Sequence, residues 1–307
     1  MTTQTKYSSE VQFGLPQVGN TPLLYLGSLS SDKVKVYAKA EWDQPGGSVK
    51  ARAAHAIISR AIATGQLDGN KSLLDASSGN TAIAYATLLK PLGWHPTICL
   101  PANASAERKN ILKALGANLV LTSPLEGTDG AQIRAAELFA EHPSKYFYAD
   151  QYTNDANWQA HYNSTANEIW KQTKGTITHF VAGLGTTGTF TGTGRRLKEL
   201  GNVNLISLQP NSPMHALEGW KHLETARIPT IYDPSLADAS LVIDSEDAFS
   251  MIRYIADHEG LLISPSGAAN LEGVVEIASQ IKEGIIVTTL ADSLDRYSEI
   301  KKEIFSS

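Results

Sequence analysis

The sequence is poor in cysteine and has no long apolar run. Its single cysteine, Cys99, excludes an internal disulfide and with it a disulfide-stabilised fold. Cys99 lies in the short apolar segment 96–101, so we expect a buried strand residue rather than a nucleophile. No apolar run approaches the length of a membrane span, and the N-terminal residues lack a signal-peptide core. We therefore expect a cytoplasmic protein with no membrane partner.

The sequence also lacks an excess of positive charge. The chain has 307 residues, with 26 Lys and Arg against 31 Asp and Glu, and its net charge is −5. No dense Lys/Arg cluster is present, so we expect neither nucleic acid nor an anionic membrane surface as a partner. Small molecules are the expected partners. The length suffices for two modest domains.

Short apolar, β-branched segments alternate with amphipathic stretches along the chain. The segments predicted as strands are 73–75, 97–100, 118–122, 177–181, 204–208 and 285–289. The clearest predicted helices are 49–67, 81–89, 106–115, 131–142 and 158–172. This alternation is typical of an α/β fold in which helices cover parallel sheets. The least regular stretch, 209–234, is expected to form a mobile loop over a site.

A loop rich in glycine and threonine, residues 183–189, follows the predicted strand 177–181 and precedes a helical pattern at 190–200. Glycines let the backbone approach an anion, and a helix N-terminus offers free N–H groups and the positive end of the helix dipole. The loop lacks the Lys-Ser/Thr pair of a nucleotide-binding loop and the glycine spacing of a dinucleotide site. It therefore predicts a phosphate site for a ligand smaller than ATP or NAD.

Lys50 directly follows a glycine-containing turn, 44–49, and a helix is expected to begin there. An ammonium group there meets the positive end of the helix dipole, which lowers the lysine pKa, as burial also would. Taken alone, Lys50 is more simply interpreted as a solvated lysine at the helix start. The segment 77–81 alone is equally consistent with a capping turn.

Several motifs considered together resemble one known family. They are Gly19–Leu23, Lys50 with its preceding turn, Ser77–Thr81, Ser105–Arg108, His161-Tyr162, Glu168–Trp170, the loop 183–189 and Asp295–Tyr297. In this order and at these spacings, the chain resembles the cysteine synthases, which are pyridoxal-phosphate enzymes of fold type II with a tryptophan synthase β-like fold. Residues 178–181 and 185–189 most resemble the branch that contains the second bacterial cysteine synthase and the O-phosphoserine sulfhydrylases.

The resemblance implies two α/β domains, each with a twisted, mostly parallel sheet flanked by helices. Residues 46–154 would form a smaller, mobile domain. Residues 1–45 and 155–307 would form a larger, cofactor-binding domain. A homodimer is also implied, as is binding of the C-terminal tail of serine acetyltransferase in the active site.

The resemblance also assigns residues to the cofactor, pyridoxal 5′-phosphate. Lys50 would hold it covalently and serve as the catalytic base, and Asn80 would bind its ring 3′ oxygen. The cofactor phosphate would be bound by Gly185, Thr186, Thr187, Gly188 and Thr189. Either Asp292 or Ser293 would contact the pyridine nitrogen, and Asp292 is favoured because a carboxylate keeps that nitrogen protonated. No metal is implied.

The carboxylate of the amino-acid substrate would be bound by Ser77, Ser78, Gly79, Thr81 and Gln151, through neutral donors at another helix N-terminus. The implied reaction makes L-cysteine from an activated L-serine, with O-acetyl-L-serine favoured, and sulfide. Three alternatives stay open. An O-phosphoserine sulfhydrylase would use Lys221 to bind the donor phosphate, although Lys221 is equally consistent with a solvated surface lysine. Another fold type II β-lyase or synthase and a non-catalytic regulatory paralogue are the other two.

Overall fold

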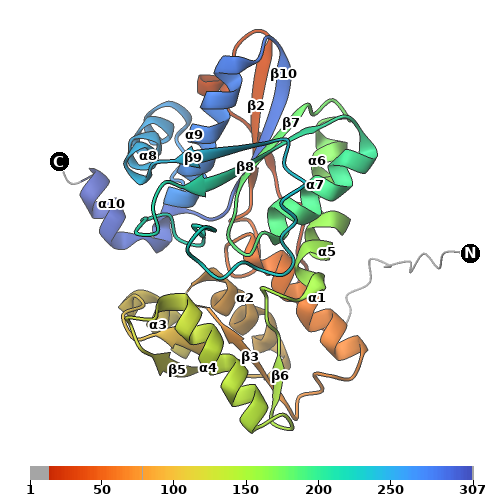
Figure 1. The fold of residues 1–307 in the computed structure, drawn as a ribbon, viewed down its shortest axis with the longest axis vertical. Helices are drawn as coiled ribbons and strands as arrows, with labels where there is room; N and C mark the ends of the chain where they lie inside the picture. The colour runs from red at the N-terminus through yellow and green to blue at the C-terminus, as the bar shows by residue number, and fades with distance from the viewer. Residues whose placement is uncertain (1–13, 78, 306–307) are drawn as a thin grey trace, which may run out of the picture.

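Two sheets organise the chain in the computed structural model, which describes residues 14–77 and 79–305. The larger sheet has the strand order β1-β2-β10-β7-β8-β9, and the smaller one has the order β5-β4-β3-β6. Strands β1 and β2 pair antiparallel, whereas the other pairs are parallel. The larger sheet lies in the upper part of Figure 1 and the smaller one below it. The predicted α/β class is confirmed.

The strands of the larger sheet are β1 (Leu23–Tyr25), β2 (Val34–Ala40), β7 (His179–Gly183), β8 (Asn204–Pro210), β9 (Ala239–Ile243) and β10 (Gly284–Leu290). Those of the smaller sheet are β3 (Ser72–Ala76), β4 (Thr97–Pro101), β5 (Asn118–Thr122) and β6 (Tyr146–Tyr148). The α-helices are α1 (Lys50–Ala63), α2 (Asn80–Leu89), α3 (Ala106–Ala114), α4 (Gly127–Glu141), α5 (Asp155–Asn163), α6 (Thr165–Gln172), α7 (Gly188–Leu200), α8 (Ser245–Glu259), α9 (Pro265–Gln280) and α10 (Ser298–Phe305). Short 3₁₀ turns occur at Gly27–Leu29, Lys90–Leu92 and Leu294–Arg296.

Side chains of the smaller sheet alternate between two buried layers. Leu73 and Ile98 pack with residues of α1 and α2, while Leu74 and Cys99 pack with residues of α4 on the other face. This alternation follows from the two-residue repeat of a strand. Cys99 is fully buried, as predicted. Burial raises the pKa of its thiol to about 12, so the thiol stays protonated at neutral pH.

The larger sheet is covered on both faces in the same way. Val36 and Val181 lie in one cluster with residues of α8 and α9, and Phe180 and Val287 lie in the other with residues of α6 and α7. Figure 1 shows α8 and α9 on one side of this sheet and α6 and α7 on the other. Both faces of its central strands are therefore buried, which explains their continuous apolar sequences.

The predicted single helix 158–172 is wrong, because two helices, α5 and α6, occupy this region. Ser164 separates them with φ −119° and ψ −72°. Its hydroxyl donates to the Ala160 carbonyl oxygen and accepts from the Arg52 guanidinium, a tertiary contact that local periodicity does not encode.

The six predicted strands each match an observed strand, and four further strands, β1, β2, β6 and β9, had not been predicted. No helix or strand occurs between residues 211 and 238, but the mobility of this loop stays a prediction. The domain boundaries at 46 and 154 also stay predictions. Within residues 14–77 and 79–305, no helix is long and apolar enough to cross a membrane.

Close packing of α7 on α5 predicts an effect of Gly192→Ala on stability. An added Cβ at Gly192 would overlap the Trp158 carbonyl oxygen, so the helices must separate. We expect a loss of about 2 kcal/mol of unfolding free energy despite the better helix propensity of alanine. Chemical denaturation measures it. Gly267→Ala is the matched control, because its Cβ would meet only ordinary contacts of 3.4 Å or more. Equal stability of the two variants would contradict the overlap argument.

Candidate functional site

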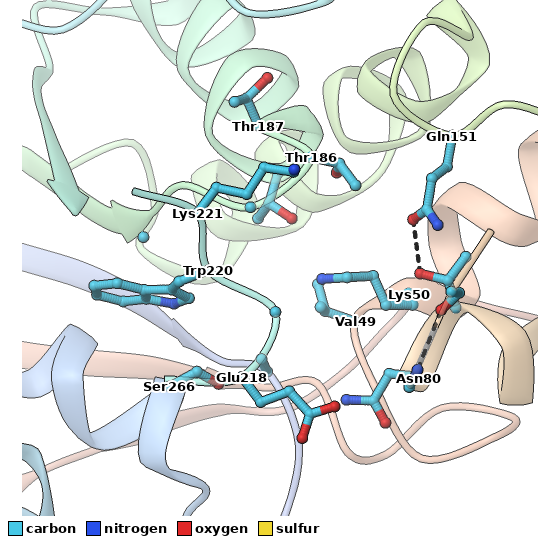
Figure 2. Close-up of a pocket in the computed structure, with 18 of the residues that line it drawn as sticks. Val49, Lys50, Asn80, Gln151, Thr186, Thr187, Glu218, Trp220, Lys221 and Ser266 are labelled. Atoms are coloured by element: carbon cyan, nitrogen blue, oxygen red, sulfur yellow. Dashed lines mark hydrogen bonds between the residues drawn. The ribbon is translucent and has the colours of Figure 1, made fainter. Parts of the chain in front are cut away.

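One cavity of about 150 Å³ lies where strands of both sheets end. Ser77 follows β3 and Gln151 follows β6 of the smaller sheet, while Gly185 follows β7 and Ala291 follows β10 of the larger one. Parallel strands bring their carboxyl ends to one edge, where ligands bind in α/β proteins. Figure 2 shows the side chains of Lys50, Asn80, Gln151 and Lys221, which all line this cavity.

Lys50 is the first residue of α1 and lines the cavity. Two contacts fix the preceding turn to the end of β10: the Val49 N–H donates to the Ala291 carbonyl oxygen at 2.9 Å, and Ser48 forms a β-bridge with Asp292. Burial lowers the pKa of Lys50, and the charges of Asp292 and Glu41 oppose this shift. A lysine with a lowered pKa is a more available nucleophile and base at neutral pH.

The loop 183–189 lies across the cavity, and its residues Gly185, Thr186, Thr187 and Thr189 are part of the lining. A Cβ at Gly185 would overlap the Gly219 carbonyl oxygen, and one at Gly188 would overlap the Asn157 side chain. Glycine is therefore required by packing at both positions. Gly188 is the first residue of helix α7 and does not itself line the cavity.

Thr187 precedes α7 in a left-handed conformation, with φ 69°. Such a conformation is strained for a β-branched residue and is typical of functional turns. Its side chain is 2% exposed, and its hydroxyl has no hydrogen-bond partner among the described residues. An unpaired buried hydroxyl is costly, so Thr187 is well suited to bind an oxyanion at the α7 N-terminus.

The segment 77–81 forms a second concentration of donors, at the N-terminus of α2. The Ser77 hydroxyl oxygen accepts from the Gly79 and Ala82 N–H groups, each at 3.3 Å. The Thr81 hydroxyl donates to the Gln151 side-chain oxygen at 2.8 Å, which joins the α2 start to the loop after β6. The predicted residue Ser78 lies outside the described residues.

Asn80 connects this segment to the end of β10. Its amide nitrogen donates to Asp292 Oδ2 at 2.8 Å, and its oxygen accepts from the Arg296 guanidinium at 2.9 Å. Asp292 Oδ2 also accepts from the Tyr297 hydroxyl at 2.8 Å. Asp292 is fully buried, and its Oδ1 has no partner among the described residues. Ser293 instead accepts from the Asp295 N–H at the start of the 3₁₀ turn 294–296.

The structure brings the predicted residues together with two exceptions. Ser77, Gly79, Asn80, Thr81, Gln151 and Lys221 line the cavity with Lys50, as do Gly185, Thr186, Thr187 and Thr189 of the loop. Gly188 and Asp292 do not line it, although Ala291, next to Asp292, does. Lys221 is already paired, with its Nζ 3.2 Å from Asp129 Oδ1 and 5.1 Å from the Tyr152 ring centroid.

Sequence reasoning missed Glu218, Trp220, Ser266 and Asn270, which also line the cavity. The Glu218 carboxylate pairs with Arg108 of α3. Burial raises the pKa of Glu218, Asp292 adds to the shift, and Arg108 opposes it. Irregularity of the stretch 209–234 indicated a loop over a site, but nothing local distinguished Glu218 from a solvated glutamate.

The cavity therefore combines the amine of Lys50 with hydroxyl-bearing residues at two helix N-termini, those of α2 and α7. Within the described part of the chain, no group of three or more His, Cys, Asp or Glu side chains could hold a metal ion. Residues 15–292 match the family of pyridoxal-phosphate dependent enzymes. The chain belongs to this family.

Relatives of this pyridoxal-phosphate dependent enzyme cover most of its length. It is 44% identical over 292 residues to the cysteine synthase of Aquifex aeolicus, which spans 92% of this chain and 89% of the relative. It is 36% identical over 282 residues to cysteine synthase B of Escherichia coli, covering 91% and 92% of the two chains. The crystal structure of a cysteine synthase from Entamoeba histolytica superimposes with a TM-score of 0.89 at 28% identity, covering 100% and 94%.

The residues present fit pyridoxal phosphate. The unpaired Thr187 hydroxyl and the close approach of backbone at Gly185 suit its phosphate, and Lys50 supplies the primary amine that its aldehyde requires. The unpaired Asp292 Oδ1, buried behind the cavity wall, is an acceptor that suits a protonated ring nitrogen.

Proposed function

We propose that this enzyme makes L-cysteine from an O-activated L-serine, with O-acetyl-L-serine favoured, and sulfide. The observation that carries the proposal is that one cavity holds both Lys50 and the hydroxyl-rich loop 185–189. The relatives, whose names describe cysteine synthases, support the choice of reaction. A cytoplasmic location, a homodimer and binding of the serine acetyltransferase tail belong to the same proposal.

Bound pyridoxal phosphate would withdraw electrons from the bonds around the substrate α-carbon. Lys50 would hold the cofactor and, once released, take the proton from that carbon with its Nζ. Its lowered pKa favours the neutral amine that this step needs. Gly185, Thr186, Thr187, Gly188 and Thr189 would keep the phosphate in place while Lys50 is detached.

The substrate carboxylate would bind at the α2 N-terminus through Ser77, Ser78, Gly79, Thr81 and Gln151, where the helix dipole and hydroxyl donors stabilise an anion. Asn80 would orient the cofactor ring beside that carboxylate. Asp292 would keep the ring nitrogen protonated, and its hydrogen bonds from Asn80 and Tyr297 would hold the carboxylate in position.

Replacing Lys50 tests the central assignment. We expect Lys50→Ala to lose the visible absorption of a lysine-bound cofactor and to lower kcat about 1000-fold, because the base is removed. Absorption spectroscopy and steady-state kinetics measure both effects. Lys171→Ala on α6, outside the cavity lining, is the control. A Lys50→Ala enzyme with an unchanged band would rule out the covalent role.

The role of Thr187 in phosphate binding has its own test. We expect Thr187→Val to weaken pyridoxal phosphate binding about fivefold to tenfold, the equivalent of one hydrogen bond. Fluorescence titration of the cofactor-free chain measures the Kd. Thr193→Val is a matched control, because the Thr193 hydroxyl is also buried and unpaired among the described residues but lies outside the cavity lining. Equal effects at both positions would argue against a phosphate contact at Thr187.

The donor is tested at Lys221, the residue that an O-phosphoserine sulfhydrylase would use. The pairing of Lys221 with Asp129 leaves its charge partly neutralised, which favours the uncharged acetyl group. We expect Lys221→Ala to lower kcat/KM for O-acetylserine and O-phosphoserine by similar factors, below about fivefold. Asp129→Asn, which frees the Lys221 charge, should improve use of O-phosphoserine. A selective loss of O-phosphoserine turnover in Lys221→Ala would favour the phosphoserine alternative.

The regulatory paralogue is tested with the same protein. When O-acetylserine and sulfide are supplied, a catalytic enzyme should release one acetate for each cysteine formed. A binding protein should release none. If the protein were a non-catalytic regulatory paralogue, replacing Lys50 would leave its binding of the serine acetyltransferase tail unchanged.

A further inference from the structure

A buried network of two cations and two carboxylates lies directly beside the Lys50 turn. Arg52 is two residues after Lys50 and is 1% exposed. Its guanidinium donates six hydrogen bonds to oxygen atoms. Its Nε and Nη2 contact the Glu41 carboxylate at 2.7 and 2.8 Å. Its Nη1 and Nη2 contact Glu168 at 2.7 and 2.8 Å. Lys39 completes the network with a 2.8 Å contact to Glu168.

The network connects elements that are distant in sequence. Arg52 is in the first turn of α1, Lys39 is on β2, Glu41 follows β2 and Glu168 is on α6. The Glu41 N–H donates to the Leu290 carbonyl oxygen at the end of β10. The carboxylate thus lies near the strand end to which the Lys50 turn is also fixed.

The charges of the network balance, which explains how it persists in the interior. Isolated buried charges are very unfavourable, but pairs with saturated hydrogen bonds are tolerated. Burial would raise the pKa of Glu168, but its hydrogen bonds and charge interactions with Arg52 and then Lys39 lower it to about 2. Burial would likewise lower the pKa of Arg52, and Glu41 and Glu168 raise it instead. Arg52 and Glu168 are therefore charged at neutral pH. Burial lowers the pKa of Lys39, and its contact with Glu168 opposes that shift.

Three titratable groups on other elements interact electrostatically with Lys50. Asp292, after β10, and Glu41, after β2, both favour its charged form. His161 of α5 is the third, and burial together with the charges of Arg52 and Lys50 lowers its pKa, so it is neutral. Glu41 is the one of these that contacts Arg52. Without a cation beside it, the Glu41 carboxylate would raise the pKa of Lys50 more strongly.

We propose that Arg52 is a positioning residue for Lys50, which neutralises Glu41 beside the reactive amine and fixes the start of α1 to the larger sheet. The inference rests on the proposed covalent role of Lys50. A guanidinium with two hydrogen bonds to Glu41 converts a net negative charge into a dipole, whose field falls off faster with distance. Lys50 then keeps the low proton affinity that burial gives it.

The proposal predicts opposite shifts for two variants. Arg52→Met leaves Glu41 without its cation, so the pKa of Lys50 should rise. Glu41→Gln leaves Arg52 without that carboxylate, so the pKa of Lys50 should fall. The double variant Glu41→Gln/Arg52→Met removes both charges and should return close to the wild-type value.

The readout is the rate at which added pyridoxal phosphate attaches to the full-length, cofactor-free chain between pH 6 and 10. Attached cofactor is reduced with borohydride and located by peptide mass spectrometry. Only the neutral amine reacts, so below the pKa a rise of one unit slows attachment about tenfold. We expect attachment at pH 7 to be about tenfold slower in Arg52→Met and faster in Glu41→Gln.

Glu168→Gln is the matched control, because Glu168 pairs with Arg52 in the same network but is not among the charges that shift the pKa of Lys50. It should lower the melting temperature but change the attachment rate less than twofold. If Arg52→Met does not fold, Glu41→Gln alone tests the proposal. It is expected to speed cofactor attachment, whereas a disturbed fold would slow it. Folded Arg52→Met and Glu41→Gln chains with the wild-type pH profile would overturn the proposal.

The same experiment separates this inference from the proposed function. If the wild-type chain attaches the cofactor at a residue other than Lys50, the proposed role of Lys50 fails. If the wild type attaches it at Lys50 and both network variants do so with unchanged pH dependence, only the role of Arg52 fails. Restoration of the wild-type profile in the double variant would support a charge effect rather than loosened packing.

Discussion

The site depends on the attachment of the turn before α1 to the end of β10. The Val49 N–H bonds to the Ala291 carbonyl oxygen, and Ser48 bridges to Asp292. These backbone contacts place the first residue of α1 at the carboxyl end of the larger sheet, where the loop after β7 also begins. Lys50 lines the cavity at this place. The packing of α1 and α2 then brings the segment 77–81 to the same opening.

Charge is distributed unevenly around this cavity. The loop 185–189 and the segment 77–81 offer backbone N–H groups, hydroxyls and helix dipoles, which attract anions without placing a competing cation beside Lys50. The two carboxylates whose charges raise the pKa of Lys50 are held differently: Glu41 is paired with the Arg52 cation, whereas Asp292 accepts hydrogen bonds from the neutral donors Asn80 and Tyr297. Burial lowers the pKa of Lys50 against the opposing charges of Asp292 and Glu41, which favours a neutral amine in this cavity.

Prediction from the sequence succeeded where local pattern and burial agree. β10 is a continuous β-branched run over residues 285–289, and β8 has leucine and isoleucine at 205 and 206; both strands are largely buried, and such short runs identify them in the sequence. β2 was not predicted, although its lysines alternate with apolar residues as in a strand with one exposed face. Local pattern does not show that Lys39 is buried, because its charge is paired with Glu168 only in the folded network. The break at Ser164 was missed for the same reason, since it depends on Arg52, a residue distant in sequence. Glu218 gave no local signal because its partner Arg108 lies on α3, which is distant in sequence.

The sequence by itself determined the α/β class, predicted a phosphate site in the loop 183–189 and, through ordered motifs, established the resemblance to cysteine synthases. These properties reside in short segments whose backbone and side-chain chemistry is local. The tertiary structure decided which of those segments share a cavity, that Asp292 is buried behind the cavity wall and that Lys221 is paired with Asp129. It also decided the protonation tendency of Lys50, because desolvation and the fields of Glu41, Arg52 and Asp292 exist only when distant strands and helices pack together.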